Sequence, residues 1–187
     1  MVRKEKAFSI VELLVTIAVF GVVLALAIPS FNQSVLNNRS VSVAEDFADA
    51  IRYARAEAMK TSSPITLCPL DAKNVDDETD DVCGDDWRNG WLVVKDTAAA
   101  VADDPVVAND NAILRRWPKN DINFAYSFTP ARTYIRFAAL GVLSRDKGTN
   151  NAVVQIHLDK CKDDSARTIT VSLSGMMRVE RSSCSPI

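Results

Sequence analysis

The sequence predicts an α+β protein in which one long amino-terminal helix packs on an antiparallel β-sheet domain. Three features of the chain lead to this prediction. An apolar run from Phe8 to Ile28 contains a single charged residue, Glu12. Apolar side chains then recur at helical spacing, and after about residue 62 the period changes to the alternation of strands. A chain of 187 residues has room for one such domain and an anchor.

The apolar run is long enough to cross a membrane as a helix. At about 1.5 Å per residue it would span roughly 31 Å, close to the thickness of the hydrocarbon layer. Arg3, Lys4 and Lys6 precede it and predict a cytoplasmic amino end. The small residues around Leu26 resemble a signal cleavage site, but a carboxylate inside the apolar core argues against a secretory signal. We therefore interpret residues 8–28 as a membrane anchor in which Glu12 has a functional role.

The helical pattern continues beyond the anchor. Buried positions are expected at three- and four-residue spacing, with charged residues on the other faces. We expect one helix from about Phe8 to Met59, bent near Pro29, because a proline ring removes a backbone hydrogen bond and clashes with the preceding turn. The positions predicted to pack on the domain are Val43, Phe47, Ile51, Ala54 and Ala58.

Eight strands are predicted after the helix, separated by turn signals rich in glycine, proline and asparagine. No parallel β-α-β rhythm is visible, which favours an antiparallel arrangement. The predicted strands are Ile65–Leu70, Gly90–Lys95, Ala112–Trp117, Ile122–Phe128, Tyr134–Ala138, Ala152–Leu158, Thr168–Leu173 and Met176–Glu180.

The four cysteines fall into two pairs close in sequence, Cys68 with Cys83 and Cys161 with Cys184. Four cysteines allow three connectivities, and the sequence does not choose among them. Pairing within each local pair is expected because each pair brackets a hydrophilic loop. Zinc is the competing interpretation, but the chain has no C-x-x-C motif and one histidine. Two disulfides therefore indicate an oxidising compartment.

Charge is distributed unevenly behind a net charge of −2. Residues 29–111 contain 7 basic and 16 acidic residues, whereas residues 112–187 contain 12 basic and 6 acidic residues. A basic half can mark a nucleic-acid surface, or the two halves can attract each other or neighbouring subunits. Trp87, Trp91 and Trp117 could stack on nucleic-acid bases, but core or subunit contacts are the commoner role.

No active site, cofactor site or metal site is predicted, and the protein is not expected to be an enzyme. The acidic stretch between Asp71 and Asp86 could attract calcium, but its spacing does not fit an EF-hand loop, and a solvated loop is expected. His157 alternates with apolar neighbours on a predicted strand and is expected to be an ordinary strand residue. One histidine and no nucleophile-elbow motif leave no catalytic triad.

The run from Ala7 to Leu14 resembles the leader motif of the type IV pilin superfamily. The resemblance implies that a prepilin peptidase cleaves between Ala7 and Phe8 and that the new terminus at Phe8 is N-methylated. It also implies that Glu12, the fifth mature residue, docks against the terminal amine of a neighbouring subunit. Ala7 departs from the family, which usually has glycine at that position.

The rest of the chain resembles the GspH/FimT branch of that superfamily. The segments that carry the resemblance are Ala50–Ala58, Ile65–Pro69, Trp87–Trp91, Ile135–Phe137 before Gly141, and Ile169–Gly175. The cysteine pairs look like those of FimU-type minor pilins. FimT-type relatives bind DNA through a Gly-Arg-x-Arg motif, and the matching stretch here begins at Gly175, with Met176 in place of the first arginine. Arg178 and the nearby Arg181 remain as possible DNA contacts.

The resemblance implies a pilin-like division of the chain: leader 1–7, membrane and filament-core helix 8–28, amphipathic helix 29–62, and disulfide-bonded domain 63–187. It implies a minor pilin that acts in initiation or at the tip of a type IV pilus, with other minor pilins and the major pilin as partners. A DNA-binding minor pilin for natural transformation and a GspH-like pseudopilin of type II secretion are the alternatives. The expected location is the inner membrane with a periplasmic domain, then the extracellular pilus.

Overall fold

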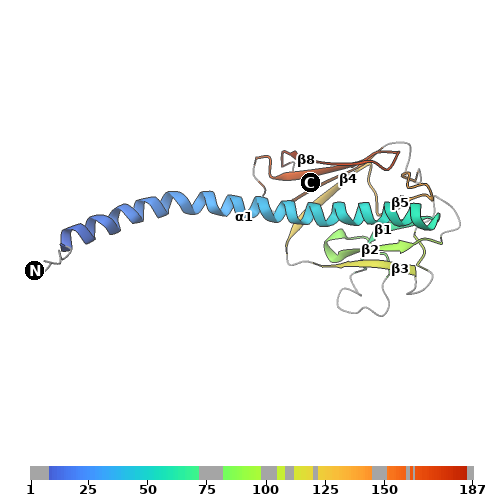
Figure 1. Cartoon of the computed structure of the whole chain (residues 1–187), viewed down its shortest axis with the longest axis horizontal. Helices are drawn as coiled ribbons and strands as arrows, with labels where there is room; N and C mark the ends of the chain where they lie inside the picture. The colour runs from blue at the N-terminus through green and yellow to red at the C-terminus, as the bar shows by residue number, and fades with distance from the viewer. Residues whose placement is uncertain are drawn as a thin grey trace, which may run out of the picture.

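The protein is described by a computed structural model that covers residues 9–71, 82–97, 105–107, 112–119, 122–144, 151–158, 161 and 163–184, with backbone alone at 26–30 and 32–33. One long helix is followed by two antiparallel sheets (Figure 1). The predicted α+β class, one long helix on antiparallel sheets, is confirmed.

The helix α1 runs without interruption from Ile10 to Thr61. Ser9 caps its amino end, where the Ser9 hydroxyl oxygen accepts a hydrogen bond from the Val11 amide at 3.4 Å. Ser62 ends it in the left-handed conformation, a common way to terminate a helix. The helix continues through Pro29, and its first half is inclined to the second (Figure 1).

The sheet residues form two four-stranded layers. One sheet has the order β3-β2-β1-β5 and the other the order β4-β6-β7-β8, with antiparallel neighbours throughout the described pairings. A short 3₁₀ turn, η2 (Trp87–Asn89), precedes β2. The strands are β1 (Ile65–Pro69), β2 (Gly90–Lys95), β3 (Ile113–Pro118), β4 (Phe124–Thr129), β5 (Ile135–Phe137), β6 (Ala152–Leu158), β7 (Ala166–Val171) and β8 (Met177–Ser182).

Each predicted strand is present, with ends shifted by at most two residues, which is the usual scatter of strand boundaries. Two-residue shifts occur at the start of β4, at both ends of β7 and at the end of β8, and the last two strands flank the turn at Gly175. The glycine has φ +77°, and the two strands pair from Val171–Met177 to Ala166–Ser182. Pairing through the hairpin therefore moves β7 earlier and extends β8 beyond the alternation visible in the sequence.

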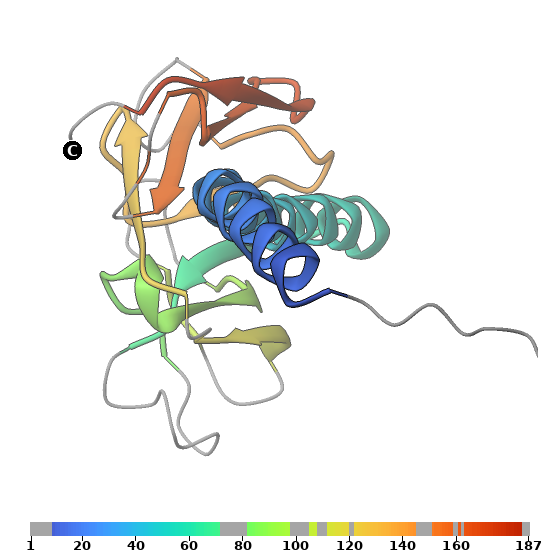
Figure 2. The same ribbon diagram turned by 90° about the vertical axis from the view of Figure 1, so that its left-hand side faces the viewer.

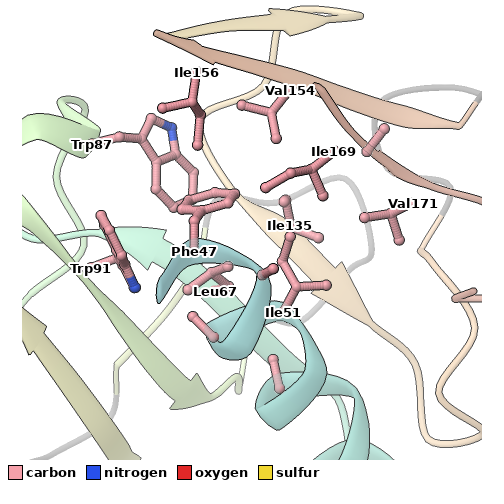
Figure 3. Packing of buried hydrophobic residues seen from close by; sticks show 14 of the residues in the cluster. Phe47, Ile51, Leu67, Trp87, Trp91, Ile135, Val154, Ile156, Ile169 and Val171 are labelled. Carbon is pink, nitrogen blue, oxygen red and sulfur yellow. The ribbon is translucent and has the colours of Figure 1, made fainter. Parts of the chain in front are cut away.

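The second half of α1 lies against the opening between the two sheets (Figure 2). Phe47 and Ile51 extend from the helix toward β1, β2 and β6, where they meet Leu67, Trp91 and Ile156 (Figure 3). Burial of one such side chain contributes about 1.5–3 kcal/mol, so this stripe holds the helix on the domain. All five helix positions that were predicted to be core positions are buried: Val43, Phe47, Ile51, Ala54 and Ala58.

Candidate assembly surfaces

The first half of α1 is an exposed apolar surface. Every residue from Ile10 to Ala25 is exposed, including Ile10 at 79% and Phe20 at 69%. An apolar surface of this extent requires a lipid or protein environment. Within the described part of the chain, no helix combines the length and the mean hydropathy that a membrane span requires.

Glu12 is exposed on this apolar segment, in the first turn of α1. No salt bridge joins it to another residue of the described chain, so a partner for this carboxylate would have to come from outside those residues. Ala7 and Phe8, the predicted cleavage and methylation residues, lie outside the described residues. The docking role of Glu12 remains a prediction.

Two of the three tryptophans are core residues and cannot stack on a nucleic acid. Trp87 and Trp91 are buried, and the Phe47 ring lies edge-on to both, with ring centroids 5.1 and 5.2 Å apart. Trp117 is half-buried beside α1, and the Arg115 guanidinium lies over its ring at 4.4 Å. The predicted core role is therefore confirmed for Trp87 and Trp91, whereas Trp117 already has a cation on its face.

The structure joins Cys68 to Cys83 and Cys161 to Cys184, the two local pairs that were expected. The first disulfide connects β1 to the residues before η2 and closes the acidic segment. Asp76 and its acidic neighbours Asp77, Glu78 and Asp80 lie outside the described residues. Among the residues that are described, no group of three acidic, histidine or cysteine side chains could hold a metal ion.

Asp86, at the end of this segment, caps η2 and binds two partners. Its carboxylate accepts hydrogen bonds from the Arg88 amide and guanidinium and from the Tyr126 hydroxyl. The Arg88 guanidinium holds the pKa of the Asp86 carboxyl below its usual value, and the bond from Tyr126 acts in the same direction. Burial raises the pKa of Tyr126. These bonds tie η2 to β4 and so connect the two sheets.

A buried ion pair lies inside the first sheet. Arg136 on β5 contacts Asp96, just after β2, at 2.6 Å, and both side chains are almost completely buried. The Thr66 hydroxyl on β1 donates to the same carboxylate at 2.7 Å. The Val106 amide donates to Asp96 Oδ1, which attaches residues 105–107 to the sheet. Because both charges are buried and hydrogen-bonded, this network is structural and needs no ligand.

The C-terminal part of the domain is hydrogen-bonded to α1 at the point where the helix reaches the domain. The Ser40 hydroxyl donates to the Ser165 carbonyl at 2.8 Å, and Arg167 donates to Asn37 Oδ1 at 2.8 Å. Burial lowers the pKa of Arg167, and repulsion from Arg181 lowers it further. Ser165 and Arg167 both lie in the loop that the Cys161–Cys184 disulfide closes, so the disulfide constrains the segment that contacts the helix.

The possible DNA-contact residues lie on β8, which is the outer strand of its sheet. Arg178 is exposed but forms an ion pair with Glu180 at 2.8 Å. Arg181 is also exposed, and Met176, in the place of the first arginine of the DNA-binding motif, is exposed at the hairpin turn. This arrangement offers few cations for a phosphate backbone.

His157 is a half-buried residue of β6, as expected for an ordinary strand histidine.

Residues 43–175 match the family described as Type II transport protein GspH. The chain belongs to this GspH family. Residues 2–28 match the prokaryotic N-terminal methylation motif. The resemblance to the GspH/FimT branch of the type IV pilin superfamily, which the sequence carries from Ala7 to Gly175, is therefore confirmed.

Two crystal structures of the type IV minor pilin FimU of Pseudomonas aeruginosa strain PAO1 resemble this GspH-family chain. The first has a TM-score of 0.56 and 22% identity, covering 76% of this chain and 89% of FimU. The second crystal form has a TM-score of 0.52 and 22% identity, covering 74% and 90%. At this identity the similarity establishes a shared fold. No curated protein sequence matches the chain.

One feature of this GspH-family domain was missed in the sequence, a junction at the carboxyl end of α1. Arg55 Nε donates to the Gly141 carbonyl at 3.1 Å, and Arg55 also reaches the Ser174 carbonyl. A Cβ atom at Gly175 would lie 2.0 Å from the Gly141 carbonyl oxygen, so the two turns meet at glycines. The two glycines were the available signal in the sequence, because each follows a predicted strand, and Gly141 comes after one segment that resembles the family while Gly175 ends another.

Proposed function

We propose that this protein is a minor pilin that acts in initiation or at the tip of a type IV pilus. The observation that carries the proposal is the contrast within α1, where the exposed apolar segment Ile10–Ala25 is continuous with a segment from Val43 to Ala58 whose apolar stripe is buried in a disulfide-bonded domain. A subunit built in this way can be held in a membrane by the first half and can then bury that half among the helices of other subunits. The membership of the GspH family and the methylation motif support this proposal.

In this proposal, residues 1–7 are a leader removed by the prepilin peptidase, and Phe8 becomes the N-methylated terminus. Residues 8–28 hold the subunit in the inner membrane until it is extracted into the filament. Residues 29–62 continue the helix, and residues 63–187 form the domain that faces the periplasm and then the exterior. The partners are other minor pilins and the major pilin, and no catalytic activity or cofactor is part of the function.

In this proposal, Glu12 determines how the subunit docks on its neighbour during assembly. In the low-dielectric centre of a helical bundle, an unpaired carboxylate is strongly unfavourable, whereas a carboxylate next to an amino terminus is stabilised. Docking of Glu12 against a neighbour's terminal amine would therefore set the axial register of the subunit. Glu12→Ala is expected to reduce the amount of this protein in sheared pili by about tenfold or more. Glu57→Ala, which removes an acid on the domain part of the helix, serves as the control.

The decisive experiment is deletion of the gene in its native host, with surface pili counted by electron microscopy and twitching motility scored. We expect few or no pili, and restoration by the full-length gene. Normal pili in the deletion strain would refute a role in assembly. Unchanged incorporation of Glu12→Ala would refute the docking role and leave the assembly role standing.

A pseudopilin of a type II secretion system is the second candidate, favoured by the family description itself. Secretion of type II substrates by the deletion strain separates the two functions. Loss of secretion with normal pili would support the pseudopilin, whereas loss of pili with normal secretion would support the minor pilin.

A further inference from the structure

The far end of the domain presents a second apolar surface, separate from the exposed segment Ile10–Ala25 of α1. Met59, Leu140 and Met176 are exposed at 48%, 82% and 64%, and Val142 is also exposed. They come from the end of α1, the turn after β5 and the β7–β8 turn. We call this set of four residues the distal patch. It lies at the end of α1 opposite Ile10 (Figure 1).

Hydrogen bonds and close packing fix the position of the distal patch. Arg55 bonds to the carbonyl groups of both turns, and the Leu143 amide donates to the Leu173 carbonyl at 3.0 Å. A Cβ atom at Gly141 would lie 2.7 Å from Met59 Cγ, so the turn packs directly on the helix. The exposed side chains therefore stand on a preorganised base, which lowers the entropic cost of binding a partner.

A hollow of about 250 Å³ lies beside the patch. Its lining combines apolar side chains with two arginines. Arg52 forms ion pairs with Asp49 and Glu45. Arg55 instead donates to backbone carbonyl groups and keeps its charge for a partner. Methionines adapt their shape to a partner, and arginine and apolar anchors are typical of the energetic centre of protein interfaces. The lining residues are Ile51, Arg52, Arg55, Ala56, Met59, Gly175, Met176 and Met177.

We propose that the distal patch and this hollow bind another pilin-type subunit through a segment that presents apolar side chains next to a carboxylate. The apolar part would cover Met59, Leu140 and Met176. The carboxylate would face Arg55, whose hydrogen bonds within the described chain go to the two turn carbonyl groups. Nucleic acid is disfavoured because Met176 occupies the turn and Arg178 is paired with Glu180. The proposal rests on the proposed role in filament assembly, to which it adds the surface and the chemistry of the partner.

The test uses the full-length protein expressed in its host, with the photo-cross-linker p-benzoylphenylalanine placed at Leu140 or at Met176. The expected product is an adduct with a different protein that carries a prepilin leader, cross-linked at a segment that contains Asp or Glu. A cross-linker at Val82, an exposed apolar residue outside the patch, is the matched control and should not give this adduct. An adduct with a second copy, with DNA or with lipid, or no adduct, would overturn the proposal.

A charge substitution provides the second arm. In the strain that carries the cross-linker at Met176, Leu140→Asp is expected to reduce the adduct by about tenfold, whereas Val82→Asp should leave it unchanged. Both positions are exposed, so the melting temperature of each variant should match that of the parent protein. An undiminished adduct in Leu140→Asp would also overturn the proposal.

The two proposals fail in different ways. If the deletion strain makes normal pili, assembly is not the function, yet an adduct at Met176 that Leu140→Asp abolishes would still establish the distal patch as a subunit contact. If deletion abolishes pili but neither position cross-links to another leader-bearing protein, the assembly role stands and the distal patch is refuted.

Discussion

The two halves of α1 have the same backbone conformation and opposite side-chain environments. From Ile10 to Ala25 every side chain is exposed, and the apolar residues cover all faces of the helix. From Val43 to Ala58 the apolar residues form one buried stripe, and charged residues occupy the other faces. The first half therefore depends on partners outside the chain, whereas the second half is stabilised by the domain itself. A single helix thus joins a segment that needs other subunits or lipid, Ile10–Ala25, to a segment that folds with the domain, Val43–Ala58; we call the second segment the folding element.

Two phenylalanines on the same helix give the largest expected contrast. Phe47→Ala removes a ring that packs on Trp87 and Trp91, and it should lower the free energy of unfolding by about 3–5 kcal/mol. Phe20→Ala removes an exposed ring in the first half of the helix and should change the free energy of unfolding by less than about 0.5 kcal/mol. Urea unfolding of the full-length variants in detergent, followed by tryptophan fluorescence, measures both. Equal losses would show that the two halves do not differ in this way.

Two serines test where the folding element begins. Ser40 is buried and donates to the Ser165 carbonyl, so Ser40→Ala should destabilise the domain by about 1–2 kcal/mol. Ser42 is exposed two residues later, and Ser42→Ala should be neutral or slightly stabilising, because alanine has the higher helix propensity. Thermal unfolding of both variants under the same conditions makes the comparison. A neutral Ser40→Ala would place the start of the docked helix after residue 40.

The smallest expected effect concerns pH. Burial, followed by repulsion from Asp49, raises the pKa of the Asp46 carboxyl above its ordinary value of 3.8. The folded chain therefore holds this proton more tightly than the unfolded chain does. The associated stability is fully present below pH 3.8 and is lost as the pH rises through the folded pKa.

Asp46→Asn removes this titration, so its free energy of unfolding relative to the parent should increase as the pH is raised from about 4 to 6. Asp49→Asn is the matched variant, because it retains Asp46 but removes the repulsion, and it should move the Asp46 titration toward lower pH. Carboxyl-carbon NMR titration follows both. An Asp46 midpoint at or below the ordinary value would contradict the assigned cause.

Local patterns in the sequence were sufficient for the elements of the fold. Helical spacing identified the buried stripe from Val43 to Ala58, and alternation identified every strand to within two residues. These features depend on neighbours a few residues apart, which a single sequence displays directly. The acidic segment after Asp71 and the cleavage residues Ala7 and Phe8 remain expectations, since they lie outside the described residues.

By itself, the sequence determined the long helix, the apolar run with Glu12, the eight strands and the resemblance to pilins. The tertiary structure decided the rest. It divided the strands into two sheets, paired Arg136 with Asp96, attached Arg167 to Asn37, and brought Met59, Leu140 and Met176 to one end of the domain. The physical reason is separation along the chain. Periodicity reports which face of an element is apolar, whereas contacts between residues about 40 to 130 positions apart depend on how several elements pack at once.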